Sequence, residues 1–549
     1  MNRYDELYPR PLLQRDSFFS LNGEWLCNDS LIEVPFPPES SLSGYSGKKE
    51  EFYYRKDFSL PEGFYREDDE VILHFGAVDQ LASVTLNDHF LLFHEGGYTP
   101  FEIDITPYLK DVNHLEVYAV DHLETFYPYG KQTLHPHGMW YTPVSGIWQS
   151  VWIEARPKDG VRSLSIKTDD NHLEIEIETE AEKAEALLHL PVRDLRTSFE
   201  EGKALFDLSE IPHELWSTDH PVLYDLEIAT PSETVKSYCA FRKIERKKIG
   251  GHERLFLNGK PLFINGLLDQ GYWSDGIFLP EDPEQIAKEI TAVKELGYNC
   301  LRKHIKAEPE IFYHECDKQG ILVMQDMINS GDYSFFSDTI LPTVGISLNR
   351  EKIADPKRFN FFIDTSKEII SRVKNHPCIF AYTIYNEGWG QQGASRAYEI
   401  LREEDPERLF DSCSGWFETE KSDFDSKHIY FRNKVLKGRG KLLLLSECGG
   451  FSRRIKGHAD KEKTYGYGKT DSEEALTEAI LSMHEKMTIP SIYNGLCGVI
   501  MTQVSDVEEE INGLFTYDRK VCKVNKEKIR EANERLQKIY EESIEKDKQ

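Results

Sequence analysis

The first 157 residues alternate short apolar segments with turn-forming residues, a pattern typical of an antiparallel β-sandwich. Residues 71–75 (VILHF) and 83–86 (SVTL) are two such segments, with glycine, proline, asparagine and aspartate distributed between segments of this kind. In residues 147–154 (IWQSVWIE), one face of a strand would carry Ile147, Val151 and Ile153. We therefore predict a first β-sandwich over residues 1–157.

A second stretch, residues 158–243, also lacks helical periodicity. It contains residues 173–178 (LEIEIE) and 222–228 (VLYDLEI), in which apolar and polar positions alternate. This length and pattern predict a small immunoglobulin-like β-sandwich.

From residue 244 to the end of the chain, short apolar strands alternate with amphipathic helices. Helices are expected at 283–296, at 473–487 and from about 525 onwards. Eight strands are expected, at residues 262–267, 299–304, 321–327, 379–385, 408–412, 428–431, 442–446 and 498–504. Eight strand–helix units of this kind predict a (β/α)8 TIM barrel over residues 244–549, with its chemistry at the carboxyl ends of the strands.

The net charge of −29 disfavours nucleic acid and anionic membrane surfaces as partners. No run of about 18 apolar residues predicts a membrane span. The nine scattered cysteines predict reduced thiols, and the N-terminal residues do not resemble a secretory signal, so we expect a cytoplasmic protein. The expected partner is neutral or small, and a homo-oligomer is compatible with the sequence.

Two glutamates stand where the fourth and seventh predicted barrel strands end. Asn386 and Glu387 follow residues 379–385, and Glu447 follows residues 442–446. A single carboxylate at a strand end is usually a helix cap or half of an ion pair, but two at facing strand ends are less easily explained in that way. Retaining glycosidases use two carboxyl groups about 5–5.5 Å apart, one as acid/base and one as nucleophile. The pair therefore predicts glycoside hydrolysis.

The chain resembles glycoside hydrolase family 2, which contains β-galactosidases, β-glucuronidases and β-mannosidases, over nearly its whole length. The resemblance is carried by the segments 97–101 (GYTPF), 146–152 (GIWQSVW), 215–224 (LWSTDHPVLY), 241–245 (FRKIE), 299–302 (NCLR), 316–320 (CDKQG), 386–387 (NE) and 446–447 (SE). It implies a jelly-roll, sugar-binding-like first domain and retaining hydrolysis. We expect no cofactor and identify no metal ligands in the sequence.

The resemblance also implies roles for individual residues. Glu387 would be the acid/base and Glu447 the nucleophile, with Tyr430 donating a hydrogen bond to the nucleophile. Arg302 and Asn386 would bind at the same site, Asn386 holding the hydroxyl beside the anomeric carbon. Further candidate substrate contacts at the strand ends are His304, Lys306, Asp326 and Trp389.

The chain departs from the family pattern at several positions. Arg302 is followed by Lys303, His304, Ile305 and Lys306, so the family histidine is displaced by one place and its role does not transfer. His304 is either a hydrogen-bonded strand-end histidine or a substrate contact. Thr502 stands where the family commonly has a tryptophan under the sugar.

A third departure concerns the charge of the substrate. Glucuronidases read the substrate carboxylate with an Asn-x-Lys segment, but this chain has Glu510, Ile511 and Asn512 there. Two facing carboxylates repel by roughly 1 kcal/mol or more, which disfavours a uronic acid, although Lys303 or Lys306 could supply the missing charge.

We therefore expect a retaining exo-β-glycosidase for small neutral β-glycosides, with a β-galactoside favoured over a β-glucuronide. The alternative from another class is a non-catalytic carbohydrate-binding protein. The loop 328–345 would either line the aglycone side of the site or simply cover it, and His135 and His137 are expected to be structural rather than metal ligands.

Overall fold

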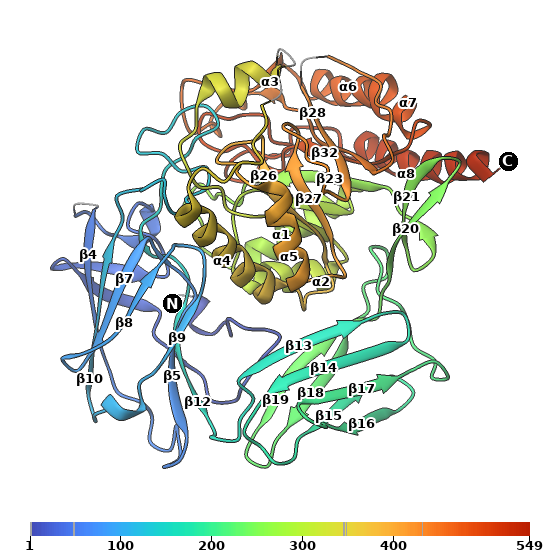
Figure 1. Cartoon of the computed structure of the whole chain (residues 1–549). Coiled ribbons are helices and arrows are strands. Elements are labelled where there is room, and N and C mark those ends of the chain that lie inside the picture. The colour runs from blue at the N-terminus through green and yellow to red at the C-terminus, as the bar shows by residue number, and fades with distance from the viewer. Residues whose placement is uncertain (1–2, 48–49, 344–345, 347, 431, 549) are drawn as a thin grey trace.

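The computed structural model shows two β-sandwiches and a (β/α)8 barrel packed against one another (Figure 1). It describes residues 3–47, 50–343, 346, 348–430 and 432–548. The first sandwich is blue in Figure 1, the second is teal to green, and the barrel occupies the upper half of the view. We propose domain boundaries at 1–157, 158–243 and 244–549, which agree with the sheets described below.

The first sandwich consists of a four-stranded and a six-stranded antiparallel sheet. The smaller sheet has the order β1 (Phe19–Ser20), β12 (Val151–Arg156), β5 (Glu70–Phe75) and β9 (Phe101–Asp104). The larger sheet has the order β3 (Ser30–Val34), β2 (Gly23–Cys27), β4 (Glu51–Phe58), β10 (Asn113–Val120), β7 (Leu81–Leu86) and β8 (His89–Glu95).

The predicted face of residues 147–154 is confirmed in part. Ile147, Val151 and Ile153 share the core of the first sandwich. The strand itself is interrupted, because Gly146–Ile147 (β11) pairs with Val78–Asp79 (β6) and regular pairing resumes only at β12. Trp148 does not belong to this core. It packs edge-on against Phe278 of the barrel domain at 5.0 Å between ring centroids, so this residue connects the two domains.

The second sandwich has the immunoglobulin-like two-sheet arrangement that the sequence predicts. One sheet contains β13 (Ser163–Thr168), β14 (His172–Glu178) and β17 (Lys203–Asp207). The other has the order β16 (Asp194–Ser198), β15 (Glu185–His189), β18 (Tyr224–Ala229) and β19 (Thr234–Cys239). Leucine and isoleucine from alternate positions of these strands fill its core.

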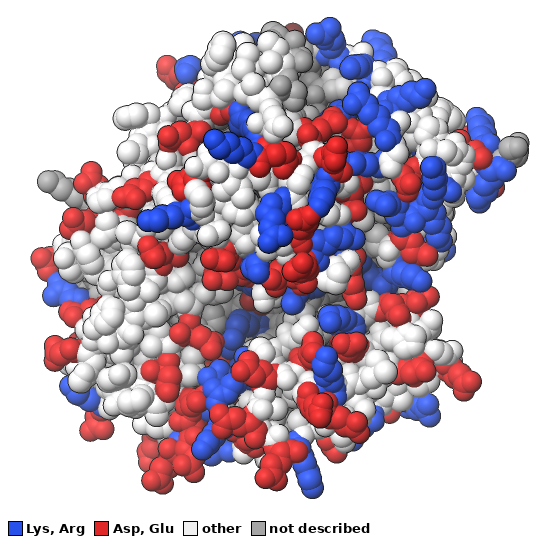
Figure 2. All heavy atoms as spheres, viewed as in Figure 1, with Lys and Arg blue, Asp and Glu red and all other residues white. Residues whose placement is uncertain are grey.

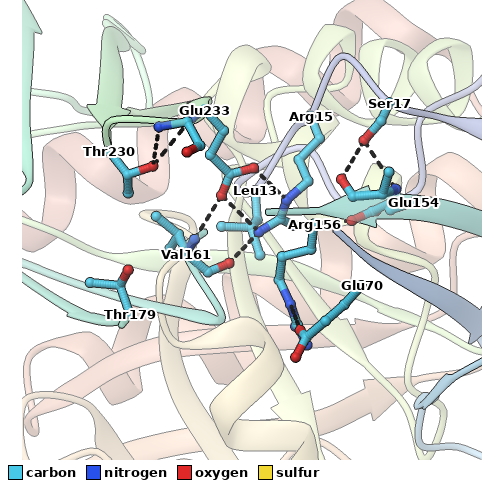
Figure 3. A network of polar contacts seen from close by, with 12 residues as sticks. Leu13, Arg15, Ser17, Glu70, Glu154, Arg156, Val161, Thr179, Thr230 and Glu233 are labelled. Atoms are coloured by element: carbon cyan, nitrogen blue, oxygen red, sulfur yellow. Dashed lines mark hydrogen bonds and ion pairs between the residues drawn. The ribbon is translucent and has the colours of Figure 1, made fainter. Parts of the chain in front are cut away.

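A buried ionic network joins the N-terminal segment to both sandwiches (Figure 3). Arg15 lies 3.0 Å from Glu154 of β12 and 3.0 Å from Glu233, which precedes β19. The side chains of Arg15 and Glu154 are 3% and 1% exposed. Burial opposes ionisation of Glu154, but the charges of Arg10 and Arg15 and a hydrogen bond from Tyr8 outweigh it and hold the pKa of this carboxyl well below its usual range. The network fixes the two sandwiches relative to each other.

The barrel begins after a short antiparallel sheet of β20 (Ile244–Ile249), β21 (His252–Leu257) and β22 (Lys260–Pro261). Its eight parallel strands are β23 (Ile264–Asp269), β24 (Cys300–Lys303), β25 (Leu322–Asp326), β26 (Ile379–Asn386), β27 (Leu409–Ser414), β28 (Phe424–Ile429), β29 (Leu442–Gly449) and β32 (Leu496–Thr502). The ladder runs in the order β27-β26-β25-β24-β23-β32-β29-β28. Its two ends, β27 and β28, meet where the hydroxyls of Ser414 and Ser426 lie 3.3 Å apart.

The helices of the barrel domain surround these strands. They are α1 (Glu284–Glu295), α2 (Glu310–Gln319), α3 (Leu341–Thr343), α4 (Pro356–Val373), α5 (Ala394–Glu404), α6 (Glu473–Met483), α7 (Ile489–Ile492) and α8 (Lys526–Lys548), with π-helical turns η4 (Phe335–Ile340) and η5 (His484–Thr488). A small parallel pair, β30 (Phe451–Arg453) and β31 (Tyr467–Thr470), follows β29. The three predicted helices correspond to α1, to α6 with η5, and to α8.

The predicted strands agree with the observed ones except for the sixth. We expected residues 428–431, of which Phe431 lies outside the described residues, whereas β28 spans Phe424–Ile429. Apolar periodicity does not predict its full extent because Ser426 and His428 direct polar groups toward Ser446 and Ser414 of the neighbouring strands. The interior of a barrel near its catalytic end accepts such residues, so apolar periodicity alone is a weak guide there.

A long loop of the first sandwich reaches the mouth of the barrel. Residues 121–145, here called the mouth loop, connect β10 to β11. The amide of Tyr129 donates to the carbonyl oxygen of Asn329 at 3.1 Å, and the amide of Thr142 donates to Glu508 at 2.7 Å. The first domain therefore forms part of the surface at which the barrel chemistry is expected.

All nine cysteines are free thiols, and eight are buried. Among the described residues, no helix has both the length and the apolar character needed to cross a membrane. On the face shown in Figure 2, basic side chains are interspersed with many acidic ones, in keeping with the net charge of −29.

Replacing Arg15 should destabilise the protein substantially. Arg15→Met leaves Glu154 buried with fewer positive charges, which we expect to cost about 3 kcal/mol of unfolding free energy at pH 7. Because the folded-state pKa of Glu154 is depressed, this contribution is present above the unfolded value of about 4.3 and is lost as the pH falls further. Urea unfolding at pH 7 and at lower pH measures it.

Arg55→Met is the matched control, since Arg55 pairs with Asp29 at 2.7 Å but the two side chains are 45% and 90% exposed. We expect this variant to lose no more than about 1 kcal/mol. Equal unfolding midpoints for the two variants would contradict a structural role of the buried network.

Candidate active site

Glu387 and Glu447 meet at the carboxyl ends of the barrel strands, as predicted. Glu387 directly follows β26, and Glu447 lies near the end of β29. Oxygen atoms of both carboxylates and a ring nitrogen of His428 all lie within 4.8 Å of one another. The site therefore brings two carboxyl groups and an imidazole close together.

Glu387 is held by a turn of unusual backbone conformation. Its φ is 51°, in the left-handed region, and its amide donates to the carbonyl oxygen of Ser414 at 3.0 Å. Gly388 follows with φ 69°, and a Cβ there would lie 2.0 Å from the ring of Phe417. Only glycine fits at position 388. The turn is therefore fixed both by the hydrogen bond of the Glu387 amide and by the close approach of Phe417 to Gly388. It leaves the Glu387 side chain 17% exposed at the mouth of the barrel.

Glu447 is more deeply buried and surrounded by groups that stabilise its negative charge. Arg302 lies 3.1 Å from one carboxylate oxygen, and Tyr430 donates a hydrogen bond to the other. Burial alone would raise the pKa of Glu447, but its electrostatic interactions with His428 and Arg302 and the Tyr430 hydrogen bond lower it to about 2. Glu447 is therefore a carboxylate at neutral pH.

Arg302 connects several strand ends. Its Nε donates to Asp326 at 2.9 Å and its Nη2 donates to the side-chain oxygen of Asn386 at 2.9 Å. Because the Asn386 oxygen faces the guanidinium, the amide NH2 is the end that can donate to another molecule. Asp326 also accepts from His304 at 2.8 Å, so five of the predicted site residues form one connected network with Glu447.

His428 is a central residue that the sequence reasoning did not identify. Its Nδ1 lies 2.8 Å from Glu387 and 3.5 Å from Glu447, and its Nε2 lies 3.0 Å from the hydroxyl of Ser414. The ring therefore contacts both carboxylates and forms a bridge between them. A polar residue that points into the barrel from the sixth strand could have indicated His428. This signal can be used only when the residue range and register of β28 are known.

Glu387, His428 and Glu447 are also the one group of three potential metal ligands found within the described ranges. A histidine with two carboxylates is a reasonable zinc ligand set. The contact of 2.8 Å between His428 and Glu387 is an ordinary hydrogen bond, however, and accounts for their arrangement by itself.

The remaining predicted residues occupy different places. Trp389 is at the site edge, where its Nε1 donates to the carbonyl oxygen of Gly331 at 2.7 Å. His304 is buried and bonded to Asp326, in agreement with the strand-end alternative. Lys306 is bound elsewhere. Its Nζ lies 2.7 Å from the carbonyl oxygens of Gly271 and Phe278 and 2.9 Å from Glu308.

Lys303 is likewise occupied, because it pairs with Asp269 at 2.9 Å and is fully buried. Its charge and that of Lys306 are therefore compensated by Asp269 and Glu308. The suggestion that either lysine supplies a positive charge to a substrate carboxylate is not supported by these contacts.

Thr502 and Glu510 form another side of the site. The hydroxyl of Thr502 lies 3.0 Å from that of Tyr430. Glu510 accepts hydrogen bonds from Tyr141 of the mouth loop and, at 2.9 Å, from Asn512. Burial raises the pKa of Glu510, while the Tyr141 hydrogen bond and the charge of Lys131 oppose the rise. Lys131, also from the mouth loop, thus adds a positive charge that the sequence reasoning had not considered.

Comparison with known proteins identifies the family. A family model described as a glycosyl hydrolase 2 galactose-binding domain-like domain matches residues 22–141, and one for the TIM barrel domain of glycosyl hydrolases family 2 matches residues 249–434. The chain belongs to glycoside hydrolase family 2. This confirms the family that the sequence motifs indicated, together with the jelly-roll and barrel architecture.

Its family 2 relatives by sequence are longer proteins. It is 28% identical over 354 residues to a β-galactosidase of Thermoanaerobacter pseudethanolicus, covering 60% of this chain and 44% of that protein. It is 25% identical over 414 residues to a β-galactosidase of Lactobacillus delbrueckii subsp. bulgaricus, covering 71% of this chain and 38% of that protein. The chain thus spans less than half the length of both.

Similar solved structures match the family 2 fold over nearly the whole chain. A β-D-glucuronidase from Dictyoglomus thermophilum has a TM-score of 0.73 at 19% identity and covers 96% of this chain and 98% of its own. A β-galacturonidase from Eisenbergiella tayi bound to galacturonate has a TM-score of 0.69 at 20% identity, covering 97% and 99%. At these identities the likeness establishes the fold alone.

Proposed function

We propose that this chain is a retaining exo-β-glycosidase that hydrolyses small neutral β-glycosides. The observation that carries the proposal is the approach of Glu387 and Glu447 within 4.8 Å at the carboxyl ends of the barrel strands. Such a separation suits attack by one carboxylate while the other protonates the leaving group, and leaves less room for the water that an inverting enzyme places between them.

In the first step, Glu447 attacks the anomeric carbon while Glu387 gives a proton to the glycosidic oxygen. The C–O bond to the aglycone breaks, the aglycone leaves as an alcohol, and the sugar is esterified to Glu447. In the second step, Glu387 takes a proton from water, whose oxygen attacks the anomeric carbon and releases Glu447. The low pKa of Glu447, about 2, suits both the attack and its later departure.

The surrounding residues position these groups. Arg302 and Tyr430 fix the carboxylate of Glu447, and Arg302 also orients Asn386 so that its NH2 can donate to a sugar hydroxyl. His428 contacts Glu387 at 2.8 Å and helps to orient its carboxyl group. A carbohydrate-binding protein without catalysis would gain little from holding two carboxylates and an imidazole so close together, which disfavours that alternative.

A neutral sugar is supported by the electrostatics of the site. Glu510 is buried and close enough to Glu447 for their charges to interact, and Lys303 and Lys306 are compensated elsewhere. The relatives named above are β-galactosidases, which favours a β-galactoside. The second candidate is a β-uronide, favoured by Lys131, a buried cation of the mouth loop whose charge acts on both Glu510 and His304.

The two catalytic glutamates should respond differently to removal of their charge. Glu447→Gln should lose essentially all turnover, since the attacking carboxylate is gone. Glu387→Gln should keep part of its activity on glycosides with acidic leaving groups, which need little protonation, and lose far more on poor leaving groups. A series of aryl and alkyl β-glycosides measures both dependences through kcat/KM.

Glu531→Gln, an exposed position on α8, is the matched control and should behave as the wild type. Equal losses of Glu387→Gln on good and poor leaving groups would contradict the acid role. Substantial turnover by Glu447→Gln would contradict the nucleophile role.

Substrate charge should be decided by the balance of Glu510 and Lys131. We expect a β-galactoside to be hydrolysed with a higher kcat/KM than the matching β-galacturonide and β-glucuronide. Glu510→Gln removes a negative charge and should raise the uronide-to-galactoside ratio several-fold, whereas Lys131→Met should lower it. A wild-type preference for a uronide of tenfold or more, about 1.4 kcal/mol of transition-state binding, would establish the second candidate instead.

A further inference from the structure

A large pocket is shared by the first domain and the barrel domain. It has a volume of about 970 Å³ and is formed by the mouth loop, by residues 332–335 after β25 and by residues 463–465 before β31. Leu134, Met139 and Trp140 line it from the first domain, and Tyr333, Phe335 and Tyr465 line it from the barrel domain. The residues that line this pocket do not include Glu387, His428 or Glu447.

The side chains of this pocket suit an apolar ligand. Leu134 is 65% exposed and Phe335 is 62% exposed. Large apolar side chains that are so exposed at one pocket are stabilised when an apolar surface covers them. Trp140 and Tyr333 add two aromatic rings with centroids 5.0 Å apart. Aromatic rings of this kind offer both flat and edge contacts to another ring.

Several polar groups of the pocket wall already have protein partners. Asp332 accepts from Thr125 at 2.6 Å, Glu509 accepts from the amide of Gly138 at 2.9 Å, and Gln132 donates to Tyr98 at 3.0 Å. A sugar in this pocket would need hydrogen-bonding groups to replace water around its hydroxyls. Their engagement elsewhere favours an aromatic occupant over a second sugar.

The pocket adjoins the acid/base residue. Trp140 packs edge-on against Trp389 at 4.9 Å between centroids, and Trp389 is two residues beyond Glu387. Burial, with a further contribution from the charge of Glu387, raises the pKa of Tyr333 to about 12. Burial and the same charge also raise the pKa of Tyr465. Both tyrosines are therefore within electrostatic reach of Glu387.

We propose that this pocket binds the aglycone of the substrate, and that the preferred aglycone is a flat, apolar aromatic group of more than one ring. The inference rests on the proposed function, because the leaving group must lie on the side of the residue that protonates it. It assigns to the first domain a part in substrate choice, through Leu134, Met139 and Trp140. The loop 328–345 then contributes to the aglycone side through Tyr333 and Phe335, while its residues 344 and 345 lie outside the described ranges.

The test compares two substrates that share a sugar and have leaving groups of similar acidity. Phenyl and 2-naphthyl β-galactosides meet this condition, so their ratio of kcat/KM reports contacts of the second ring rather than bond-breaking. We expect the wild type to favour the naphthyl glycoside about tenfold. Leu134→Ser and Phe335→Ser should each reduce that ratio several-fold, mainly by raising KM for the naphthyl glycoside more than KM for the phenyl glycoside.

Two exposed apolar residues of the first sandwich provide matched controls. Leu31→Ser and Phe90→Ser make the same chemical changes at positions that are 57% and 64% exposed and belong to β3 and β8. They should leave the ratio unchanged. An unchanged ratio in both pocket variants, or a wild type that does not distinguish the two glycosides, would overturn the proposal.

A binding measurement separates this proposal from the proposed function. If no glycoside is hydrolysed, the proposed function fails, and calorimetry with 2-naphthyl 1-thio-β-galactoside then tests the pocket alone. Binding that weakens several-fold in Leu134→Ser and Phe335→Ser but not in the controls would support it. Absence of binding, or equal affinity in all variants, would overturn it.

Discussion

The interaction on which the site most depends is the buried guanidinium of Arg302. It bonds Asp326 on β25, Asn386 on β26, and Glu447 with the carbonyl oxygen of Ser446 on β29. A fully buried arginine is stable only when its donors are paired, so the strand ends must close around it. Together with His428, the same arginine lowers the pKa of Glu447 and so favours its ionised form. The hydrogen bonds of Arg302 therefore hold the strand ends together and position the carboxylate of Glu447.

The second constraint is the contact between the first sandwich and the barrel. The mouth loop places Tyr141 against Glu510 and Lys131 near it, and Trp140 against Trp389. The Arg15 network and the packing of Trp148 on Phe278 fix the sandwich from which this loop extends. We infer that the barrel supplies the reacting groups, while the first domain contributes to the choice of sugar and aglycone.

Much of this arrangement could be predicted from residue order. The parallel strands are short apolar runs, and Glu387 and Glu447 stand at the carboxyl ends of two of them, so both carboxylates could be placed at the mouth. Lys306 could not be placed, because only the folded chain shows that Glu308 and two carbonyl oxygens occupy its Nζ. His428 was missed for a related reason: its strand carries polar residues inward, and its register was expected too late in the chain.

Contacts between distant segments could not be predicted from the sequence either. Lys131 and Glu510 are separated by more than 300 residues, and nothing in either segment shows that their charges interact. The exposed Leu134 and Phe335 appear ordinary in the sequence and become informative only when they line one pocket. Local patterns predict elements and strand-end residues, whereas specificity depends on loops brought together from different domains.

Covalent trapping tests the central claim most directly. A 2-deoxy-2-fluoro-β-galactoside with an acidic leaving group slows both steps, and slows release of the sugar enough for the glycosyl-enzyme to accumulate. Mass spectrometry of the intact protein should show one added fluoroglycosyl group, and peptide mapping should place it on Glu447. An adduct on Glu387 or His428, or hydrolysis of the natural β-glycoside with inversion of configuration, would contradict the account.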